Sequence, residues 1–162
     1  MIDDEISVVV ATILVVTVAF ASFQLFFSGR VVEPFSEMAV LGPEMKVEGY
    51  PKTLDVNESF RLHLYIGNHE GRVVYYKVCV KVGSNSTFIN GIVPADVPVA
   101  TFYEVILASG TNKTLQMELS LQKPMVNGRL IFEMWVLNPK SLEFNYHGNW
   151  CQLWLNVTKP AT

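Results

Sequence analysis

The sequence predicts an all-β domain, an antiparallel β-sandwich, that follows one N-terminal transmembrane helix. The first observation is an uncharged run, Ile6–Phe27, which contains neither proline nor glycine. The second is an alternation of apolar and polar residues through most of residues 45–162, broken by short clusters rich in Gly, Asn and Ser. A period of two is typical of strands with one buried face. A helical period fits no window of that part of the chain.

The apolar run is long enough to cross a membrane. Its 22 residues make a helix of about 33 Å, against a bilayer core of about 30 Å. A secretory signal needs a basic start, a shorter apolar run and a small-residue cleavage site, whereas Asp3, Asp4 and Glu5 precede this run. We therefore expect residues 1–28 to be a retained membrane anchor, rather than a cleaved signal or a buried core helix.

A segment rich in proline and glycine follows the anchor. Residues 29–51 contain Pro34 and the Gly42-Pro43 pair, which divide the segment into short pieces. We expect one or two helical turns over Phe35–Leu41, with one apolar side. The segment is interpreted as a juxtamembrane collar that holds the ectodomain, residues 52–162, away from the lipid.

The ectodomain contains the alternating segments. Five of them have a clean period of two, and a sixth, Thr101–Leu107, is shorter and more apolar. Turn-forming clusters separate them at residues 67–71, 83–86, 109–112, 126–128 and 147–149. Six or seven strands of this kind predict an immunoglobulin-like sandwich. The five longer segments are Ser59–Gly67, Arg72–Val82, Asn112–Gln122, Arg129–Leu137 and Trp150–Thr158.

Two signals disagree about the side of the membrane. Arg30 and Lys46 follow the apolar run and weakly favour a cytoplasmic ectodomain by the positive-inside rule. Four N-x-[ST] acceptors favour an external one, although such triplets also recur in β-proteins rich in Asn, Ser and Thr. We give the acceptors more weight and expect a single-pass cell-membrane glycoprotein with an extracellular C-terminal domain. The acceptors are Asn57, Asn85, Asn112 and Asn156.

Several spaced motifs resemble one known family. Together they resemble an archaeal membrane-protein family known only as domain of unknown function 1616. The resemblance implies an archaeal envelope protein with an extracytoplasmic sandwich domain, and it implies no activity, substrate or site residue. The motifs lie at 29–37, 41–43, 50–51, 67–71 and 153–158.

The apolar helix has a second, weaker resemblance. Residues 6–19, with Glu5 before them, are similar to the N-terminal helix of archaeal type IV pilins and archaellum components. The processing signal of those proteins, a Lys or Arg and then a small residue, is missing from residues 1–5. A pilin-type filament or assembly component is therefore the alternative function, and the N-terminus of the mature chain would discriminate between the two.

No motif for catalysis or for a cofactor is apparent. The three histidines, His63, His69 and His147, have no metal-ligand spacing. The chain has no nucleophile elbow, P-loop or dinucleotide-binding turn, and its carboxylates are scattered. It also has no concentrated Lys/Arg stripe for a nucleic acid. We expect a protein that is not an enzyme, without cofactor, metal or nucleic-acid partner.

The two cysteines, Cys79 and Cys151, are a candidate disulfide. An exterior location permits a bridge. The alternation opposes it, because Cys79 shares the outward face with Lys77 and Lys81 whereas Cys151 shares the inward face with Leu153. The pairing remains open at this point.

Four aromatic residues are expected together on the outward side of the last two strands. Either the collar or the loop at 88–100 covers them, or they form an exposed patch that docks a partner subunit or a surface glycan. The expected function is that of a non-enzymatic envelope protein, whose partners are the membrane and another membrane or surface-layer protein or glycan. The four are Trp135, Tyr146, Trp150 and Trp154.

Overall fold

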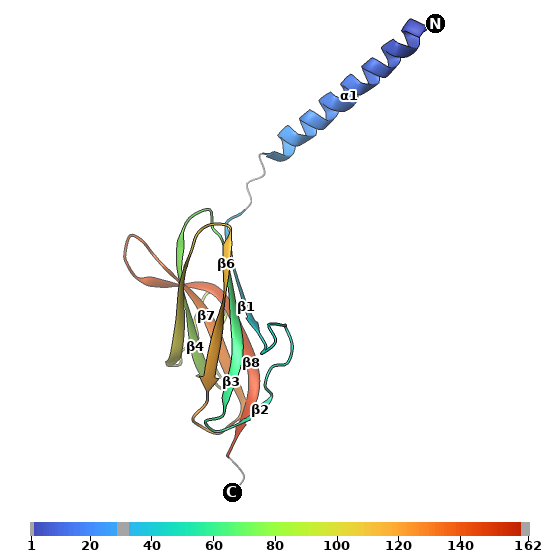
Figure 1. The fold of residues 1–162 in the computed structure, drawn as a ribbon. Coiled ribbons are helices and arrows are strands. Elements are labelled where there is room, and N and C mark those ends of the chain that lie inside the picture. The colour runs from blue at the N-terminus through green and yellow to red at the C-terminus, as the bar shows by residue number, and fades with distance from the viewer. Residues whose placement is uncertain (1, 29–32, 160–162) are drawn as a thin grey trace. The chain divides into compact units, whose positions relative to one another are not determined.

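The computed structural model describes residues 2–28 and 33–159. The chain divides into two units, Met1–Glu33 and Pro34–Thr162, which are described separately here. The first contains the helix α1 (Ile2–Ser28), and the second contains all the strands of the described residues (Figure 1).

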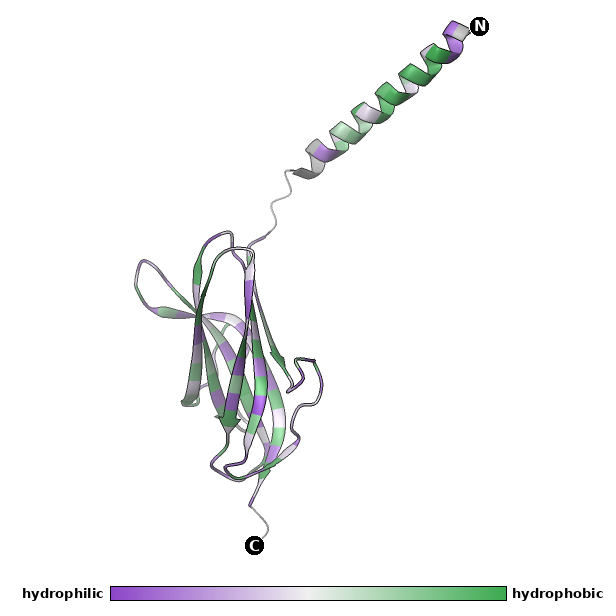
Figure 2. Ribbon diagram, in the orientation of Figure 1, coloured by the Kyte–Doolittle hydropathy of each residue, from purple (hydrophilic) through white to green (hydrophobic). Residues whose placement is uncertain are grey.

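Helix α1 is long and apolar enough to cross a membrane. Its span Asp3–Gln24 has no buried residues, and Figure 2 shows apolar residues on every side of its middle turns. Three of its polar side chains bond within the helix: Ser7, Thr12 and Thr17 each donate to a backbone carbonyl four residues earlier, at 2.8 Å. Hydroxyls bonded in this way suit an apolar medium, where an unpaired polar group is costly.

The second unit is an immunoglobulin-like β-sandwich, as predicted. A three-stranded sheet has the order β1-β3-β6, and a five-stranded sheet has the order β2-β8-β7-β4-β5. The strand pairs are antiparallel except for β2 with β8. The strands are β1 (Phe35–Leu41), β2 (Thr53–Asp55), β3 (Ser59–His69), β4 (Val74–Gly83), β5 (Val99–Leu107), β6 (Thr111–Ser120), β7 (Met125–Leu137) and β8 (Phe144–Thr158).

The core lies between the two sheets, on the faces that the alternation predicts. Buried side chains recur at every second position along the inner strands, and the strands in Figure 2 alternate between polar and apolar residues accordingly. The buried hydroxyl of Tyr76 is paired with Ser36 Oγ at 2.8 Å. Fully buried members include Leu62, Leu64, Ile66, Val78, Met117, Phe132 and Met134.

The expected helical turns over Phe35–Leu41 are wrong, because these residues form β1. All seven residues pair with β3, and Ser36 and Val40 are buried. Pro34 and Gly42 bound a segment too short for a stable isolated helix, whereas β3 offers it a full row of backbone partners. The sandwich therefore begins at Pro34, and the expected collar of residues 29–51 is mostly part of it. Its residues 29–32 lie outside the described part of the chain.

Two expected turns also lie inside strands. Residues 126–128 belong to β7 and residues 147–149 belong to β8. The β7–β8 pairing shifts its register at Met125/Gly128 and at Glu133/Trp135, so irregularities in the ladder absorb the turn-forming residues. Asn127 has φ +50° at the first irregularity, a conformation that Asn tolerates well.

Candidate functional site on the outer face of the five-stranded sheet

Residues 84–98 cover part of the outer face of the five-stranded sheet. We call them the covering loop; they connect β4 to β5. Ile89 and Ala95 pack on Ile131 of β7 in a second, small apolar core. At Gly148 of β8 the loop comes so close that an added Cβ would collide with the carbonyl oxygen of Gly91. The loop is thus packed onto the sheet.

A buried ion pair lies under the covering loop. Lys81 Nζ is 2.9 Å from Glu133 Oε2, and the two side chains are 7% and 0% exposed. Both also bond to the backbone of the loop: Lys81 donates to Ala95 O at 2.7 Å, and Ala95 N donates to Glu133 Oε1 at 2.6 Å. Trp135 Nε1 donates to the other carboxylate oxygen at 3.3 Å. These bonds offset part of the desolvation cost of the two charges and hold the loop in place.

The alternation alone did not reveal this pair. It assigns Lys81 and Glu133 to the outward face, which is correct, but it treats that face as solvated. The available signal was Ile131, a branched apolar residue at an outward position between polar neighbours. Such a residue indicates that another segment covers this part of the face.

Three of the four expected aromatics are half-buried beside the covering loop. The rings of Trp135 and Tyr146 are 5.5 Å apart, and Trp150 packs on the small core. Tyr146 donates to Asn90 O at 2.8 Å. Burial, with a smaller effect from Glu133, raises the pKa of Tyr146 to about 12. For these three residues the structure agrees with cover by the loop and not with an exposed patch.

Trp154 is the aromatic of the four that stays exposed, at 45%. The guanidinium of Arg129 lies 5.1 Å from its ring centre, in the range of a cation–π contact. Arg129 is itself held by Gln152 and by the carbonyl of Thr87. Beside the ring is an open groove lined by Gln152, Leu153 and residues 49–52. An aromatic ring is therefore presented in a fixed position next to planar polar groups.

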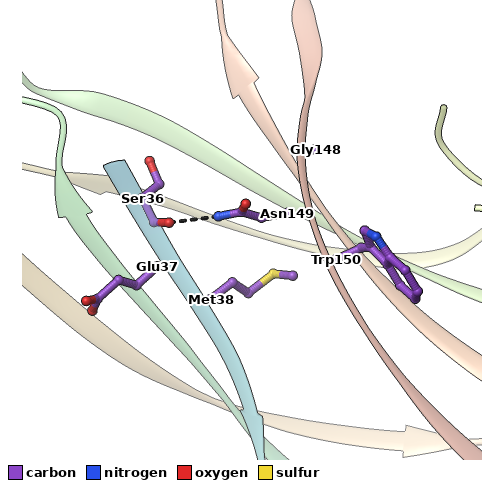
Figure 3. A pocket seen from close by; sticks show the side chains of 6 residues that line it. All are labelled: Ser36, Glu37, Met38, Gly148, Asn149 and Trp150. Carbon is purple, nitrogen blue, oxygen red and sulfur yellow. Dashed lines mark hydrogen bonds between the residues drawn. The ribbon is translucent and has the colours of Figure 1, made fainter. Parts of the chain in front are cut away.

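A shallow hollow also lies where β1 approaches β8. Figure 3 shows Asn149 reaching across to Ser36, to whose carbonyl it donates at 2.7 Å. Two further carbonyls of β1 accept side-chain donors: Met38 O from Cys151 Sγ at 3.8 Å, and Val40 O from the Tyr50 hydroxyl at 2.8 Å. These bonds cap the free edge of β1, which protects it from pairing with another chain. The hollow is therefore the place where β1 of one sheet is hydrogen-bonded to side chains of β8 in the other sheet.

The candidate disulfide does not form. Both cysteines are free, Cys79 buried and Cys151 half-buried. Cys79 pairs with Glu133 and Cys151 with Phe132, which are consecutive residues of β7. Consecutive residues of a strand point to opposite faces, so the two thiols lie on opposite sides of the sheet. Burial raises the pKa of both thiols.

The glycosylation acceptors differ in exposure. Asn57, Asn85 and Asn112 are exposed. Asn156 is half-buried, and its Oδ1 accepts from Asn127 N at 2.8 Å. Three acceptors are therefore accessible to a transferase in the folded domain, and the fourth is partly engaged.

The histidines lie in separate settings. His63 is only 4% exposed, and its Nδ1 lies 3.0 Å from the carbonyl oxygen of Gly42. His69 lies 3.7 Å from Glu37, and His147 lies 3.5 Å from Glu70. Within residues 2–28 and 33–159, no three His, Cys, Asp or Glu side chains are placed to hold a metal.

These features define an immunoglobulin-like sandwich domain that follows, in the sequence, a helix long enough to span a membrane. The chain belongs to the family described as Domain of unknown function (DUF1616), whose model matches residues 30–148. That range includes strands β1 to β7 and the start of β8. No curated protein matches the sequence.

Several solved structures are similar to the chain. A CARDB domain from Pyrococcus furiosus, in complex with di-metal ions, is 14% identical with a TM-score of 0.48, over 80% of this chain and 95% of that one. A β-glucosidase from Listeria innocua in complex with glucose is 16% identical with a TM-score of 0.46, over 76% of this chain and 16% of that one. A chain in the complex of zinc 2-glycoprotein with prolactin inducible protein from human seminal plasma is 12% identical, with a TM-score of 0.46, over 82% of this chain and 99% of that one.

Proposed function

We propose that this protein is a non-enzymatic component of the archaeal cell envelope, anchored by α1 and exposed outside the cell, and that it binds another envelope component through Trp154. The observation that carries the proposal is the fixed, exposed ring of Trp154 beside an open groove. Tryptophan and arginine are the residues that most often dominate binding at an interface. The family resemblance supports the archaeal origin in this proposal.

The neighbourhood of Trp154 supports a binding role more than a purely structural one. The ring is not needed to close the core, because the inward positions of β8 are filled by Leu153, Leu155 and Val157. Arg129 is held by two partners and orders one side of the ring before any ligand arrives. Preorganisation of this kind reduces the entropy lost on binding.

The anchor and the outside placement are supported separately. Helix α1 has the length and the all-round apolar surface of a membrane span. Three glycosylation acceptors are exposed on the sandwich, which suits a domain that meets a glycosyltransferase outside the cytoplasm.

Photocrosslinking in the native membrane tests the binding role. A photoreactive amino acid replaces Lys52, which is exposed and lines the groove, and the same amino acid replaces Phe102, which is 51% exposed on β5 of the same sheet. We expect a discrete crosslinked species from position 52 but not from position 102, and we expect Trp154→Ala to abolish it. Equal crosslinking from both positions, or a crosslink that survives Trp154→Ala, would contradict a binding role for Trp154.

A further inference from the structure

We propose that one end of the sandwich docks on the surface of the lipid bilayer. This end, which we call the anchor-side end, is the one at which β1 begins. The proposal rests on the membrane anchoring proposed above. The strand pairing places four segments there: the start of β1 and the β3–β4, β5–β6 and β7–β8 connections. Phe35 pairs with His69 at the end of β3, and the start of β4 pairs with the end of β5 and with the end of β7. Figure 1 shows the β3–β4 and β7–β8 connections at this end.

The anchor-side end presents apolar side chains from three of these segments, whereas the β5–β6 connection has only small residues. Phe35 at the start of β1 is 42% exposed, Val73 in the β3–β4 connection is 63% exposed, and Leu142 in the β7–β8 connection is 74% exposed. None of the three therefore gains full burial from the sandwich. Apolar tips on separate connections at one end are suited to insertion between lipid headgroups.

Leu142 is the most informative of the three. Its φ is +57°, a left-handed conformation that is costly for a leucine and cheap for glycine or asparagine. The connection that imposes it is well ordered, with Leu142 N bonded to Asn138 O at 2.9 Å and Asn138 N to Glu143 O at 2.8 Å. A strained, exposed leucine contributes little to the isolated domain. Burial of its side chain in lipid would offset the free-energy cost of the left-handed backbone conformation.

The charges at the anchor-side end are arranged for a surface of phosphate headgroups. Arg72 and Lys140 are exposed, lie next to or near two of the apolar tips, and line one hollow. Two of the nearby carboxylates are engaged within the sandwich: Glu37 accepts from Tyr65 at 3.0 Å, and Glu70 accepts from Ser36 at 2.7 Å. Glu143 and Glu33, the second residue before Phe35, are exposed acidic groups that oppose the two cations. Long basic side chains beside apolar tips can reach phosphates while the tips enter the interface.

The covalent chain keeps this end near the lipid. Six residues, 29–34, connect Ser28 of α1 to Phe35 of β1. At about 3.5 Å per extended residue, they span at most roughly 21 Å. Since the headgroup layer is itself about 5–8 Å thick, the anchor-side end remains within easy reach of it. The short connection gives the anchor-side end a high effective concentration at the lipid surface. Three exposed apolar side chains therefore suffice for docking.

Lipid photocrosslinking of the full chain in nanodiscs tests the proposal. A photoreactive amino acid is placed at Leu142, and at Met45 as the matched control. Met45 is also exposed, at 62%, and has a left-handed φ of +58°, but it follows β1 at the strand's other end. We expect about tenfold more lipid adduct from position 142 than from position 45, the factor that burial of one leucine side chain implies. Equal yields would overturn the proposal.

A pair of asparagine variants provides the second measurement. Leu142→Asn and Met45→Asn both relieve left-handed strain, so both should fold at least as well as the parent protein. Only Leu142→Asn should accelerate hydrogen exchange of residues 138–143 in nanodiscs of mixed zwitterionic and anionic lipid. No acceleration in Leu142→Asn would count against docking.

Alkaline extraction of the membranes separates the two proposals. Release of the chain by alkali would refute the anchor itself. A chain that stays in the membrane but gives no excess adduct at position 142 would refute docking alone. Because nanodiscs contain no other protein, a partner protein cannot produce the expected adduct.

Discussion

Lys81 and Glu133 illustrate how a single buried pair connects a loop to a sheet. Each is bonded to the other and to the backbone of Ala95, so the pair and the covering loop depend on one another. The nearby pair Lys77 and Glu104, 3.3 Å apart, lies on the same face without cover, and its side chains are 26% and 31% exposed. The two pairs use the same residue types in different surroundings and should differ in energy.

Replacement of Lys81 by methionine should destabilise the sandwich by about 3–5 kcal/mol, because it leaves a buried carboxylate unpaired. The double variant Lys81→Met/Glu133→Gln should recover most of this loss, since the amide oxygen can still accept from Ala95 N without a buried charge. Lys77→Met is the control and should cost less than about 1 kcal/mol. Urea unfolding of the four proteins measures these differences. A double variant as unstable as the single one would show that the charge is not the cause.

Among the elements, the free edge of β1 and the outer face of the five-stranded sheet are covered in different ways. The free edge of β1 is capped by side chains of Asn149, Cys151 and Tyr50. The covering loop closes the outer face between β4 and β8, and Tyr146 attaches it through Asn90. The covering loop makes few backbone–backbone hydrogen bonds. Side-chain hydrogen bonds such as that of Tyr146 therefore hold it against the sheet.

Tyr146→Phe should loosen the covering loop. The lost hydrogen bond is worth about 1 kcal/mol, and exchange of the amides of residues 88–93 should accelerate. In the parent protein the pKa of Tyr146 is raised from 10.0 to about 12. The neutral form is therefore favoured by folding, so its contribution is fully present below pH 10 and is lost as the pH rises through 12.

Unfolding measured from pH 9 to pH 12 separates this contribution from that of the other tyrosines. The stability difference between the parent protein and Tyr146→Phe should be largest at pH 9 and should shrink as the pH approaches 12. A difference that is constant over this range would contradict the assignment of the titration to Tyr146.

At the scale of the whole molecule, the remaining question is which side of the membrane holds the sandwich. If it lies outside, protease added to intact cells should remove the sandwich and leave a small membrane fragment that contains α1. Protection in intact cells, with digestion only after lysis, would instead restore the cytoplasmic orientation that Arg30 favours.

Glycosylation gives an independent measure of the same topology. We expect glycans at the exposed Asn57, Asn85 and Asn112, and little at Asn156, whose side chain is engaged with Asn127. Substitution of each acceptor by aspartate should therefore lower the glycoprotein mass at the first three positions only. Aspartate is chosen because Asn57 has φ +66°, which aspartate also tolerates. An unmodified protein from the native membrane would remove this support for an external domain.

Local periodicity was enough to predict several elements before the structure was known. The uncharged run predicted α1, and the alternation predicted the inward faces of β3, β4, β6, β7 and β8, because a strand with one buried face must repeat every two residues. The opposite faces of Cys79 and Cys151 follow from the same rule.

Only the tertiary structure decided features that depend on residues distant in the chain. Phe35–Leu41 became a strand because β3 supplied its backbone partners. The outward positions Lys81 and Glu133 became buried, and Trp135 half-buried, because residues 84–98 fold over them. The sequence left the collar, the loop at 88–100 and an exposed patch as alternatives, and only contacts between segments far apart in sequence decided among them. For the same reason, the structure alone separated Trp154 from the aromatics under the loop.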